Sequence, residues 1–349
     1  MAPHTRSMAA NEKAKASAVA RQPLQACSAP PKPQALKRRR SRKGSAEVGQ
    51  PPAWRTRCAG WSRQAESPGA EPPGANGPLA QAAPRAVPQA APHSADELEA
   101  IVISLERRPD RMAGCEARLR EFCPGLRYSR FTATDGRLTA IPDSDAVRKW
   151  HTGRNVVYQR LRAVRKGWND LDSYTERELE LSPGERGCAS SHIRAWRHCI
   201  EQARGTEKPL LVLEDDAAPT ADFWPLLRGA LAALPADAHV LYLGYSQAAD
   251  WKREISPELV EAEYVWTTVG YIVWPAGARV LLSKLPVDQP VDNYMAALCA
   301  AGDVKAYAVR PKVVRQAEPW NVNSDVAHSD EHYWGADSDI THSDCLYWG

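Results

Sequence analysis

Long apolar runs are missing from this 349-residue sequence. No uninterrupted apolar stretch approaches the roughly 18 residues that cross a bilayer, which excludes an integral membrane protein. The opening segment, MAPHTRSMAANEKAKASAVA, lacks an apolar stretch of signal-peptide length. It is basic and poor in acids, as in a transit peptide, although plain disorder fits it better. The compartment is therefore left open, with the cytoplasm as the default.

Cysteine pairs are also missing. The 8 cysteines are too few and too scattered for a disulfide scaffold. None forms a C-x-x-C pair, so structural zinc is not expected.

Apolar residues are scarce in residues 1–95, which contain only 10 Leu, Ile, Val, Met, Phe, Trp or Tyr. The same segment holds 15 Lys and Arg against 4 Asp and Glu, and half of the 28 prolines. So little apolar surface does not offset the ordering entropy, which predicts a disordered, basic, Ala/Pro-rich tail. Residues 96–349 carry a net charge of −8 and are long enough for one well-cored domain.

A basic run, LKRRRSRK at residues 36–43, lies in this tail. Such runs occur in nuclear-localisation signals and nucleic-acid patches, but a solvated tail is the more common origin. Because only Trp54 and Trp61 accompany the run, a surface that stacks single-stranded bases is not supported. A nucleic-acid partner is therefore not expected.

Short apolar runs alternate with helical patterns beyond the tail, which is typical of an α/β fold with a mostly parallel sheet. Runs that are apolar at successive positions indicate strands buried on both faces. The expected strands are 100–105, 210–213, 240–243, 269–274 and 304–309. The expected helices are 111–122, 185–204, 221–234, 275–285 and 292–301.

Two further segments stand out from this pattern. Residues 141–181 form a basic, helix-like insert whose cations either face an anionic ligand or are simply solvated. Near the end, SDVAHSDEHYWG at 324–335 recurs as SDITHSDCLYWG at 338–349, a short duplicated tail. Two copies do not make a solenoid. The repeated His, Asp and Trp either form a metal or sugar subsite or reflect a recent duplication without function.

Three consecutive carboxylates, Glu214, Asp215 and Asp216, follow the apolar run PLLVL. They are expected at the carboxyl end of a buried strand, the edge where α/β sheets bind ligands. Because adjacent carboxylates repel one another they favour a divalent counter-ion, and their hard oxygens favour Mg²⁺ or Mn²⁺. Alternation along an extended segment would point Glu214 and Asp216 the same way. The alternative is an acidic turn in which an aspartate caps the next helix.

The segment SPGERGCASSHIRAW, residues 182–196, predicts a helix start with a capping box formed by Ser182 and Glu185. Cys188 and His192 follow within two turns. A nucleophilic Cys/His or Ser/His pair is conceivable, but such close neighbours on a helix rarely have attacking geometry, so packing against the sheet is favoured. The helix N-terminus would suit a phosphate if it faces the strand ends.

A cluster of arginines follows the first expected strand in SLERRPDRM, residues 104–112. Arg107, Arg108 and Arg111 stand at a helix entry, where guanidinium groups form either a diphosphate clamp or an ordinary surface. The net negative charge of the domain favours the clamp.

The segment LPVDQPVDNYM, residues 285–295, places Asp288 and Asp292 before another helix. Asp292 is either a helix cap or a general base.

Taken in order, these motifs resemble glycosyltransferase family 25, which includes the lipooligosaccharide glycosyltransferases and the collagen galactosyltransferases. EAEYVWTTVGYIV is especially similar to the collagen-type branch. The insert at 141–181 and the missing secretory signal depart from the family's pattern and bear on the acceptor and on an endoplasmic-reticulum location. The matching stretches are IVISLERRPDRM, FTATDGR, GERGCASSHIRAW, LLVLEDD, TVGYIVWPAGARVLL and PVDNYM.

The resemblance implies a GT-A-type, Rossmann-like fold and inverting transfer of a hexose, typically galactose, from a nucleotide sugar such as UDP-galactose. It places the metal site, for Mn²⁺ or Mg²⁺, on Glu214, Asp215 and Asp216. The acceptor it implies is a saccharide or a protein hydroxyl. Its nucleotide-contacting and associated motif positions fall on Arg107, Arg108, Arg111, Asp135, Gly136, Glu185 and His192.

Inversion needs one carboxylate that takes the proton of the acceptor hydroxyl, and Asp292, or failing that Asp288, is the candidate. Trp266, Trp274 and Trp320 are candidate stacking platforms for a sugar, although core packing is the more common role of a tryptophan.

Two other classes of function compete with this interpretation. A metal-dependent hydrolase of a nucleotide or phosphoester would use the same acidic cluster and release product without an acceptor. A nucleic-acid-binding protein would use the basic tail, which alone should then bind DNA or RNA with a steep salt dependence.

We expect a chain that starts at Ser94 to fold as the full-length chain does. The removed segment has too little apolar content to contribute to a core. Calorimetry of both chains should show a cooperative thermal transition at similar temperatures. Loss of that transition in the shortened chain would contradict the domain boundary.

Overall fold

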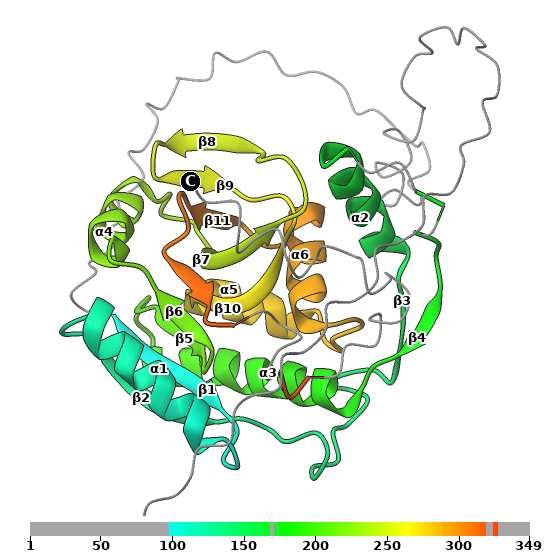
Figure 1. Cartoon of the computed structure of the whole chain (residues 1–349), viewed down its shortest axis with the longest axis horizontal. Coiled ribbons are helices and arrows are strands. Elements are labelled where there is room, and N and C mark those ends of the chain that lie inside the picture. Colours follow the sequence, from blue (N-terminus) through cyan, green and yellow to red (C-terminus); the bar gives the residue numbers. More distant parts are fainter. Residues whose placement is uncertain (1–97, 168–170, 173, 319–323, 327–349) are drawn as a thin grey trace, which may run out of the picture. The chain divides into compact units, whose positions relative to one another are not determined.

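The computed structural model describes residues 98–167, 171, 172, 174–318 and 324–326 (Figure 1). The predicted tail at 1–95, and the duplicated tail apart from residues 324–326, lie outside the described residues. Among the described residues, no helix combines the length and the apolar content that crossing a membrane requires.

An eight-stranded sheet forms the centre of the fold, in the order β2-β1-β5-β10-β7-β11-β9-β8. Six of these strands run in one direction, and β10 and β9 run in the other. The strands are β1 (Glu99–Ser104), β2 (Arg127–Thr132), β5 (Leu210–Glu214), β7 (Val240–Gln247), β8 (Arg253–Ser256), β9 (Leu259–Glu261), β10 (Val265–Val273) and β11 (Ala306–Val309).

Helices cover both faces of this sheet, as Figure 1 shows. Side chains of α1 and α4 pack in one hydrophobic cluster, and those of α3, α5 and α6 pack in another. The strand β1 contributes to both, because Ala100 and Val102 face the first cluster while Ile101 and Ile103 face the second. The helices are α1 (Pro109–Phe122), α2 (Gly153–Arg165), α3 (Pro183–Ala203), α4 (Phe223–Ala233), α5 (Pro275–Ser283) and α6 (Val291–Ala301).

The α/β class and the mostly parallel direction of the strands are confirmed, with one correction. The strand predicted at 269–274 lies in β10, which is longer and antiparallel to both of its neighbours, β5 and β7. An apolar run indicates a strand buried on both faces but carries no signal of its direction. Reversal of β10 brings its first residues, and not its last, to the edge where β1 and β5 end.

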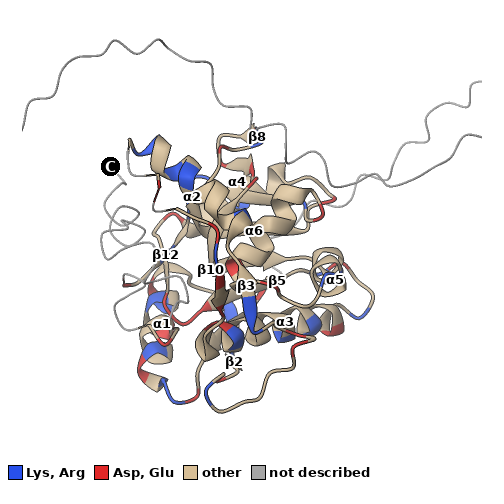
Figure 2. Ribbon diagram, turned by 90° about the vertical axis from the view of Figure 1, so that its right-hand side faces the viewer, with Lys and Arg blue, Asp and Glu red and all other residues tan. Residues whose placement is uncertain are grey.

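The insert at 141–181 is only partly helical, which corrects the prediction. It contains α2, framed by an antiparallel pair made of β3 (Lys149–His151) and β4 (Glu178–Glu180). Its arginines appear with those of α1 as blue segments in Figure 2. Arg165 pairs with Asp250 at 2.8 Å, and Arg154 lies 3.7 Å from Asp288. These two cations are therefore already matched by acids.

The start of α3 is fixed by the predicted capping box and by a close backbone contact. Ser182 Oγ accepts from the Glu185 amide, and the Glu185 carboxylate accepts from the Ser182 amide. A Cβ on Gly136 would lie 1.7 Å from the Pro183 carbonyl oxygen, and one on Gly187 would lie 2.6 Å from that of Thr134. The loop after β2 therefore packs directly on the first turns of α3.

Candidate active site

A cavity of about 740 Å³ opens at one edge of the sheet. Its walls include the ends of β1, β5 and β7 together with the beginning of β10. This is the edge at which α/β sheets commonly bind ligands, as the sequence predicts. The cavity brings the acidic cluster, two of the three arginines and Asp292 into one space.

The three carboxylates do not cap a helix. Glu214 is the last residue of β5, Asp215 and Asp216 form a turn, and the chain continues into a further strand, β6 (Ala217–Pro219). The strand β6 pairs with β12 (Val314–Gln316), and the Ala317 amide donates to the Asp216 carbonyl. The alternative of a simple helix cap is therefore wrong.

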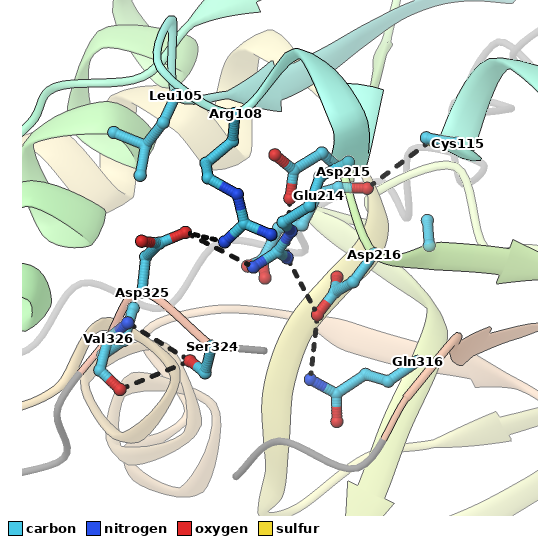
Figure 3. A network of polar contacts seen from close by, with 12 residues as sticks. Leu105, Arg108, Cys115, Glu214, Asp215, Asp216, Gln316, Ser324, Asp325 and Val326 are labelled. Atoms are coloured by element: carbon cyan, nitrogen blue, oxygen red, sulfur yellow. Dashed lines mark hydrogen bonds and ion pairs between the residues drawn. The ribbon is translucent and has the colours of Figure 1, made fainter. Parts of the chain in front are cut away.

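Arg111 supplies a counter-charge to two of these carboxylates. Its Nη2 lies 2.6 Å from Asp215 Oδ1 and 3.3 Å from Asp216 Oδ2. Asp216 also accepts from Gln316 Nε2 at 3.4 Å, as Figure 3 shows. The predicted alternation, with Glu214 and Asp216 sharing a direction, is not what the contacts show, because the turn after β5 ends the extended geometry on which alternation depends.

Glu214 is instead held by a buried chain of polar groups. Its Oε1 accepts from Thr268 Oγ1 at 2.5 Å and lies 3.2 Å from His192 Nε2. Tyr271 Oη lies 2.9 Å from His192 Nδ1 and accepts from the Trp196 indole. Since an indole only donates, the Tyr271 hydroxyl is able to donate to Nδ1, which leaves Nε2–H to donate to Glu214.

A bulge in β10 presents Thr268 to this cluster. The pairing of β10 with β7 shifts register between Trp266 and Gly270, and Thr267 has a φ of 75°. A threonine in this left-handed region is strained, and such positions gather at functional sites. The Thr267 amide donates to Asp292 Oδ2 at 3.2 Å, so the bulge also orients the candidate base.

Asp292 lies in the first turn of α6 and lines the cavity. The residue that caps the helix is Pro290, so the alternative of Asp292 as the helix cap is wrong. Its other carboxylate oxygen, Oδ1, accepts from the amide of Asn293 at 2.8 Å. Asp288, in contrast, is half-exposed, lies near Arg154 and does not line the cavity.

The three carboxyls of the acidic cluster differ in how burial and their neighbours shift their pKa values. Burial alone would raise the pKa of Glu214, but the hydrogen bonds from His192 and Thr268 hold it below its usual range. Burial raises the pKa of Asp215, and Arg111 opposes the shift. Burial and the negative charge of Glu214 raise the pKa of Asp216 to about 7. The cluster therefore contains one carboxyl that takes up a proton near neutrality.

The arginines predicted as a diphosphate clamp converge on one carboxylate, that of Asp325. Asp325 accepts from Arg107 Nη1 at 2.6 Å and from Arg108 Nη1 at 2.5 Å, and Arg111 Nη1 lies 4.0 Å away. Figure 3 shows the Asp325 side chain turned toward Arg108. Arg137 donates to the Asp325 carbonyl at 3.2 Å. An acidic residue of this chain therefore pairs with the arginines that the sequence predicts as the clamp.

The remaining predicted residues lie around this site. Asp135 accepts from Arg107 Nε at 2.7 Å, and Gly136 and Glu185 line the cavity. Trp266 also lines it, and its indole donates to Asn155 Oδ1 at 3.0 Å. Trp274 instead packs in the hydrophobic cluster with α1 and α4, which is the core role that the sequence analysis gives as the more common one. Trp320 lies outside the described residues.

The nucleophilic alternatives on α3 are not supported. Ser191 Oγ accepts from the Thr134 amide and donates to the Gly187 carbonyl, so this hydroxyl fastens the loop to the helix. Burial, reinforced by the charges of Glu214 and Asp292, raises the pKa of the Cys188 thiol well above its usual range. A thiol of this kind is a poor nucleophile.

The sequence analysis assigns no role to several of the contacting residues, although Thr268 and Tyr271 lie in the TVGYIV stretch that carries the family resemblance. Thr268 and Tyr271 reach Glu214 and His192 only because β10 is reversed and bulged. Asp325 meets Arg107 across 218 residues of sequence. Its place in the duplicated tail, whose repeated His, Asp and Trp suggest a subsite, is the one hint that the sequence contains.

Comparison with known proteins points to the same family. Residues 97–259 match the family model described as glycosyltransferase family 25 (LPS biosynthesis protein). This segment is similar to glycosyltransferase family 25. This confirms the resemblance drawn from the ordered motifs.

The relatives of this chain include proteins described as inactive. One from Homo sapiens, "Inactive glycosyltransferase 25 family member 3", is 32% identical over 209 residues, which cover 56% of this chain and 31% of the relative. "Procollagen galactosyltransferase 1" from Danio rerio is 28% identical over 156 residues, or 38% of this chain and 25% of the relative. The chain thus spans less than a third of the length of these curated relatives.

A solved structure of "a glycosyltransferase involved in the glycosylation of the major capsid of PBCV-1" is similar over 61% of this chain and 93% of the other. The two share 9% sequence identity, and the TM-score is 0.23.

The raised pKa of Asp216 predicts a pH dependence of stability. Between the unfolded value of about 3.9 and the folded value of about 7, the folded state binds the extra proton. The contribution of Asp216 to the free energy of unfolding therefore decreases as the pH rises through this window. Asp216→Asn removes the charge, so its melting temperature should rise relative to the wild type between pH 4 and pH 8 (about the span of these values).

Differential scanning calorimetry in the presence of a chelator measures this difference. Asp222→Asn is the control, because Asp222 precedes α4 and its side chain makes no capping hydrogen bond. A variant Asp216→Asn that melts below the wild type at the alkaline end would show that the ion pair with Arg111 outweighs the cost of burying the charge.

Proposed function

We propose that this domain is a metal-dependent, inverting glycosyltransferase of GT-A type that moves a hexose, galactose being the first candidate, from a nucleotide sugar to a saccharide or protein hydroxyl. The observation that carries the proposal is the convergence in one cavity of a carboxylate cluster, a group of arginines and a separate carboxylate, Asp292. Similarity of residues 97–259 to glycosyltransferase family 25 supports the same class of reaction.

The residues present fit a divalent cation with a preference for oxygen. Asp216 Oδ1 is buried without a hydrogen-bond partner among the described residues, and Glu214 Oε2 has no hydrogen bond there. Glu214, Asp215 and Asp216 would hold Mn²⁺ or Mg²⁺ once their side chains move closer together, because as a group of three their oxygens do not all lie within 4.8 Å of one another. Such an ion, when bound, offsets the negative charge that grows on a leaving diphosphate.

The arginines supply the protein's own contribution to donor binding. Arg107 and Arg111 line the cavity, and guanidinium groups match phosphate oxygens in two parallel hydrogen bonds. They stabilise the diphosphate more strongly as its charge increases, which is the requirement for catalysis. The position of Asp135 against Arg107 keeps this guanidinium at the cavity wall.

Asp292 is the proposed base for the acceptor hydroxyl. It lies on a different element from the acidic cluster, and two backbone amides, those of Thr267 and Asn293, fix its carboxylate. A proton passes from the acceptor oxygen to Asp292 as that oxygen attacks the sugar carbon and the diphosphate leaves. Attack and departure on opposite faces of the sugar ring give inversion.

The insert contributes one wall of the cavity through α2. Asn155 and Gln159 of α2 are buried and line it together with Trp266, and Arg162 lies over the Trp266 ring at 5.3 Å. Amide side chains next to an aromatic ring suit a sugar, because the ring contacts C–H groups while the amides bind hydroxyls. We therefore assign this wall to the acceptor.

A donor screen tests the proposal most directly. The full chain is incubated with Mn²⁺, a panel of nucleotide sugars and a panel of saccharide and hydroxylated peptide acceptors, and the released nucleoside diphosphate is measured. Release that depends on an acceptor supports transfer. Equal release without an acceptor supports the hydrolase instead, and no release with any donor contradicts both.

Two substitutions should separate metal binding from base catalysis. Asp216→Asn should weaken metal-dependent binding of uridine diphosphate, measured by calorimetry, because it removes a charged oxygen ligand. Asp292→Asn should leave that binding nearly unchanged and lower turnover by about 10²- to 10⁴-fold, the usual effect of losing a general base. Asp288→Asn is the control for Asp292. Full activity of Asp292→Asn together with loss in Asp288→Asn would move the base to Asp288.

Asp325 should compete with an anionic ligand for the arginines. Because its carboxylate occupies Arg107 and Arg108, a diphosphate must first break these ion pairs. Asp325→Asn should therefore strengthen binding of uridine diphosphate by roughly 2- to 13-fold, as expected for ion pairs worth about 0.5–1.5 kcal/mol. Asp303→Asn, which removes a surface partner of Lys284, is the matched control. Weaker binding in Asp325→Asn would show that Asp325 assists the ligand instead.

A further inference from the structure

A second group of ligand atoms lies beside the acidic cluster and differs from it in chemistry. Cys188 Sγ, a His192 ring nitrogen and a Glu214 oxygen all lie within 4.8 Å of one another. Among the described residues, this is the one group of three or more His, Cys, Asp or Glu that meets this condition. Sulfur and nitrogen donors favour zinc over Mn²⁺ or Mg²⁺.

The spacing on α3 is the reason that the two softer donors meet. Cys188 and His192 are four residues apart, so their side chains lie on the same face of the helix one turn from each other. Zinc-binding helices use this same spacing for two ligands. The third donor comes from the end of β5, so a helix and a strand of the core hold the group rigidly.

The ligand atoms lie near the spacing that zinc requires, and the pairs that lie farthest apart must approach by up to about 1 Å. Tetrahedral zinc with bonds of about 2.0–2.3 Å places its ligand atoms about 3.2–3.8 Å apart. His192 Nε2 and Glu214 Oε1 are already 3.2 Å apart. All three residues line the cavity, so a fourth position faces open space rather than a fourth side chain.

The surroundings of His192 suit a metal ligand. The ring nitrogen away from the group, Nδ1, lies 2.9 Å from Tyr271 Oη, and a partner of this kind commonly fixes the orientation of a ligating imidazole. Tyr271 Oη has two acceptor positions, so it can accept from Nδ1–H and from Trp196 together.

We propose that Cys188, His192 and Glu214 form an open, three-ligand zinc site that shares Glu214 with the acidic cluster. On binding, Cys188 releases its proton to solvent. The neutral imidazole of His192 keeps one proton, now on Nδ1, and Nε2 offers its lone pair to the ion. A zinc ion at this position withdraws Glu214 from Asp215 and Asp216, so zinc opposes occupation of the proposed oxygen site by Mn²⁺.

Cobalt and zinc titrations of the full chain test the site without any donor or acceptor. Co²⁺ bound to a thiolate gives a near-ultraviolet charge-transfer band, which the wild type should show and zinc should abolish. The band should be missing in Cys188→Ser. It should persist in Cys123→Ser, since Cys123 is a buried thiol that packs in the other hydrophobic cluster, away from His192 and Glu214. Competition against a chromophoric chelator should show that Cys188→Ser binds one zinc fewer, or binds it at least about tenfold more weakly.

Two further variants keep the test decisive. Cys188→Ala removes the ligand without adding a buried hydroxyl, and thermal unfolding verifies that each variant is folded. Tyr271→Phe keeps all three ligands and should weaken zinc binding about 10- to 100-fold. A missing cobalt band in the wild type, or an unchanged band and zinc affinity in a folded Cys188 variant, would overturn the site. Neither result depends on whether the domain transfers a sugar.

Discussion

Negative charge gathered at the end of β5 is the constraint on which the rest of the cavity depends. Three adjacent carboxylates in a largely buried turn need partners, because an uncompensated buried charge is costly. Arg111 reaches two of them from α1, and His192 and Thr268 reach the third from α3 and β10. The elements α1, α3 and β10, which help to form the cavity, thus also supply the partners of the three carboxylates at the end of β5.

The negative charge of the acidic cluster is only partly neutralised, which favours the binding of a cation. Asp216 keeps one buried oxygen without a hydrogen bond, and the pKa of its carboxyl lies near neutrality. Arg111 therefore offsets the cluster without saturating it. The same guanidinium lies near Asp325, so one side chain connects the carboxylate cluster to the arginines that contact Asp325. A ligand that carries both an anion and a cation would therefore change the contacts of the carboxylate cluster and those of the arginines together.

The sequence predicted the parts of this site that depend on local order. The capping box of Ser182 and Glu185 spans three residues, and the position of Glu214 follows from the strand that it ends. Arg107, Arg108 and Arg111 were placed at a helix entry, where they lie. All of these follow from periodicity and from the polarity of neighbouring residues.

Contacts between distant segments could not be predicted in this way. The direction of β10 was missed because a strand buried on both faces has the same apolar pattern whether it runs parallel or antiparallel. Thr267 and Thr268 interrupt the apolar run of β10 at the bulge, but an interruption of this kind does not indicate that Thr268 contacts Glu214. Asp325 reaches the arginines through tertiary packing alone.

The close approach of Gly136 and Gly187 restricts how this domain can diversify in evolution. At either position any other residue would place its Cβ against backbone, which cannot move aside as a flexible side chain can. The loop after β2 and the start of α3 must therefore change together or not at all. Asn155 and Gln159 are carried by a separate insert, which has no such contact at these glycines. On the proposed assignment, acceptor preference can drift between relatives while the donor side of the cavity stays the same.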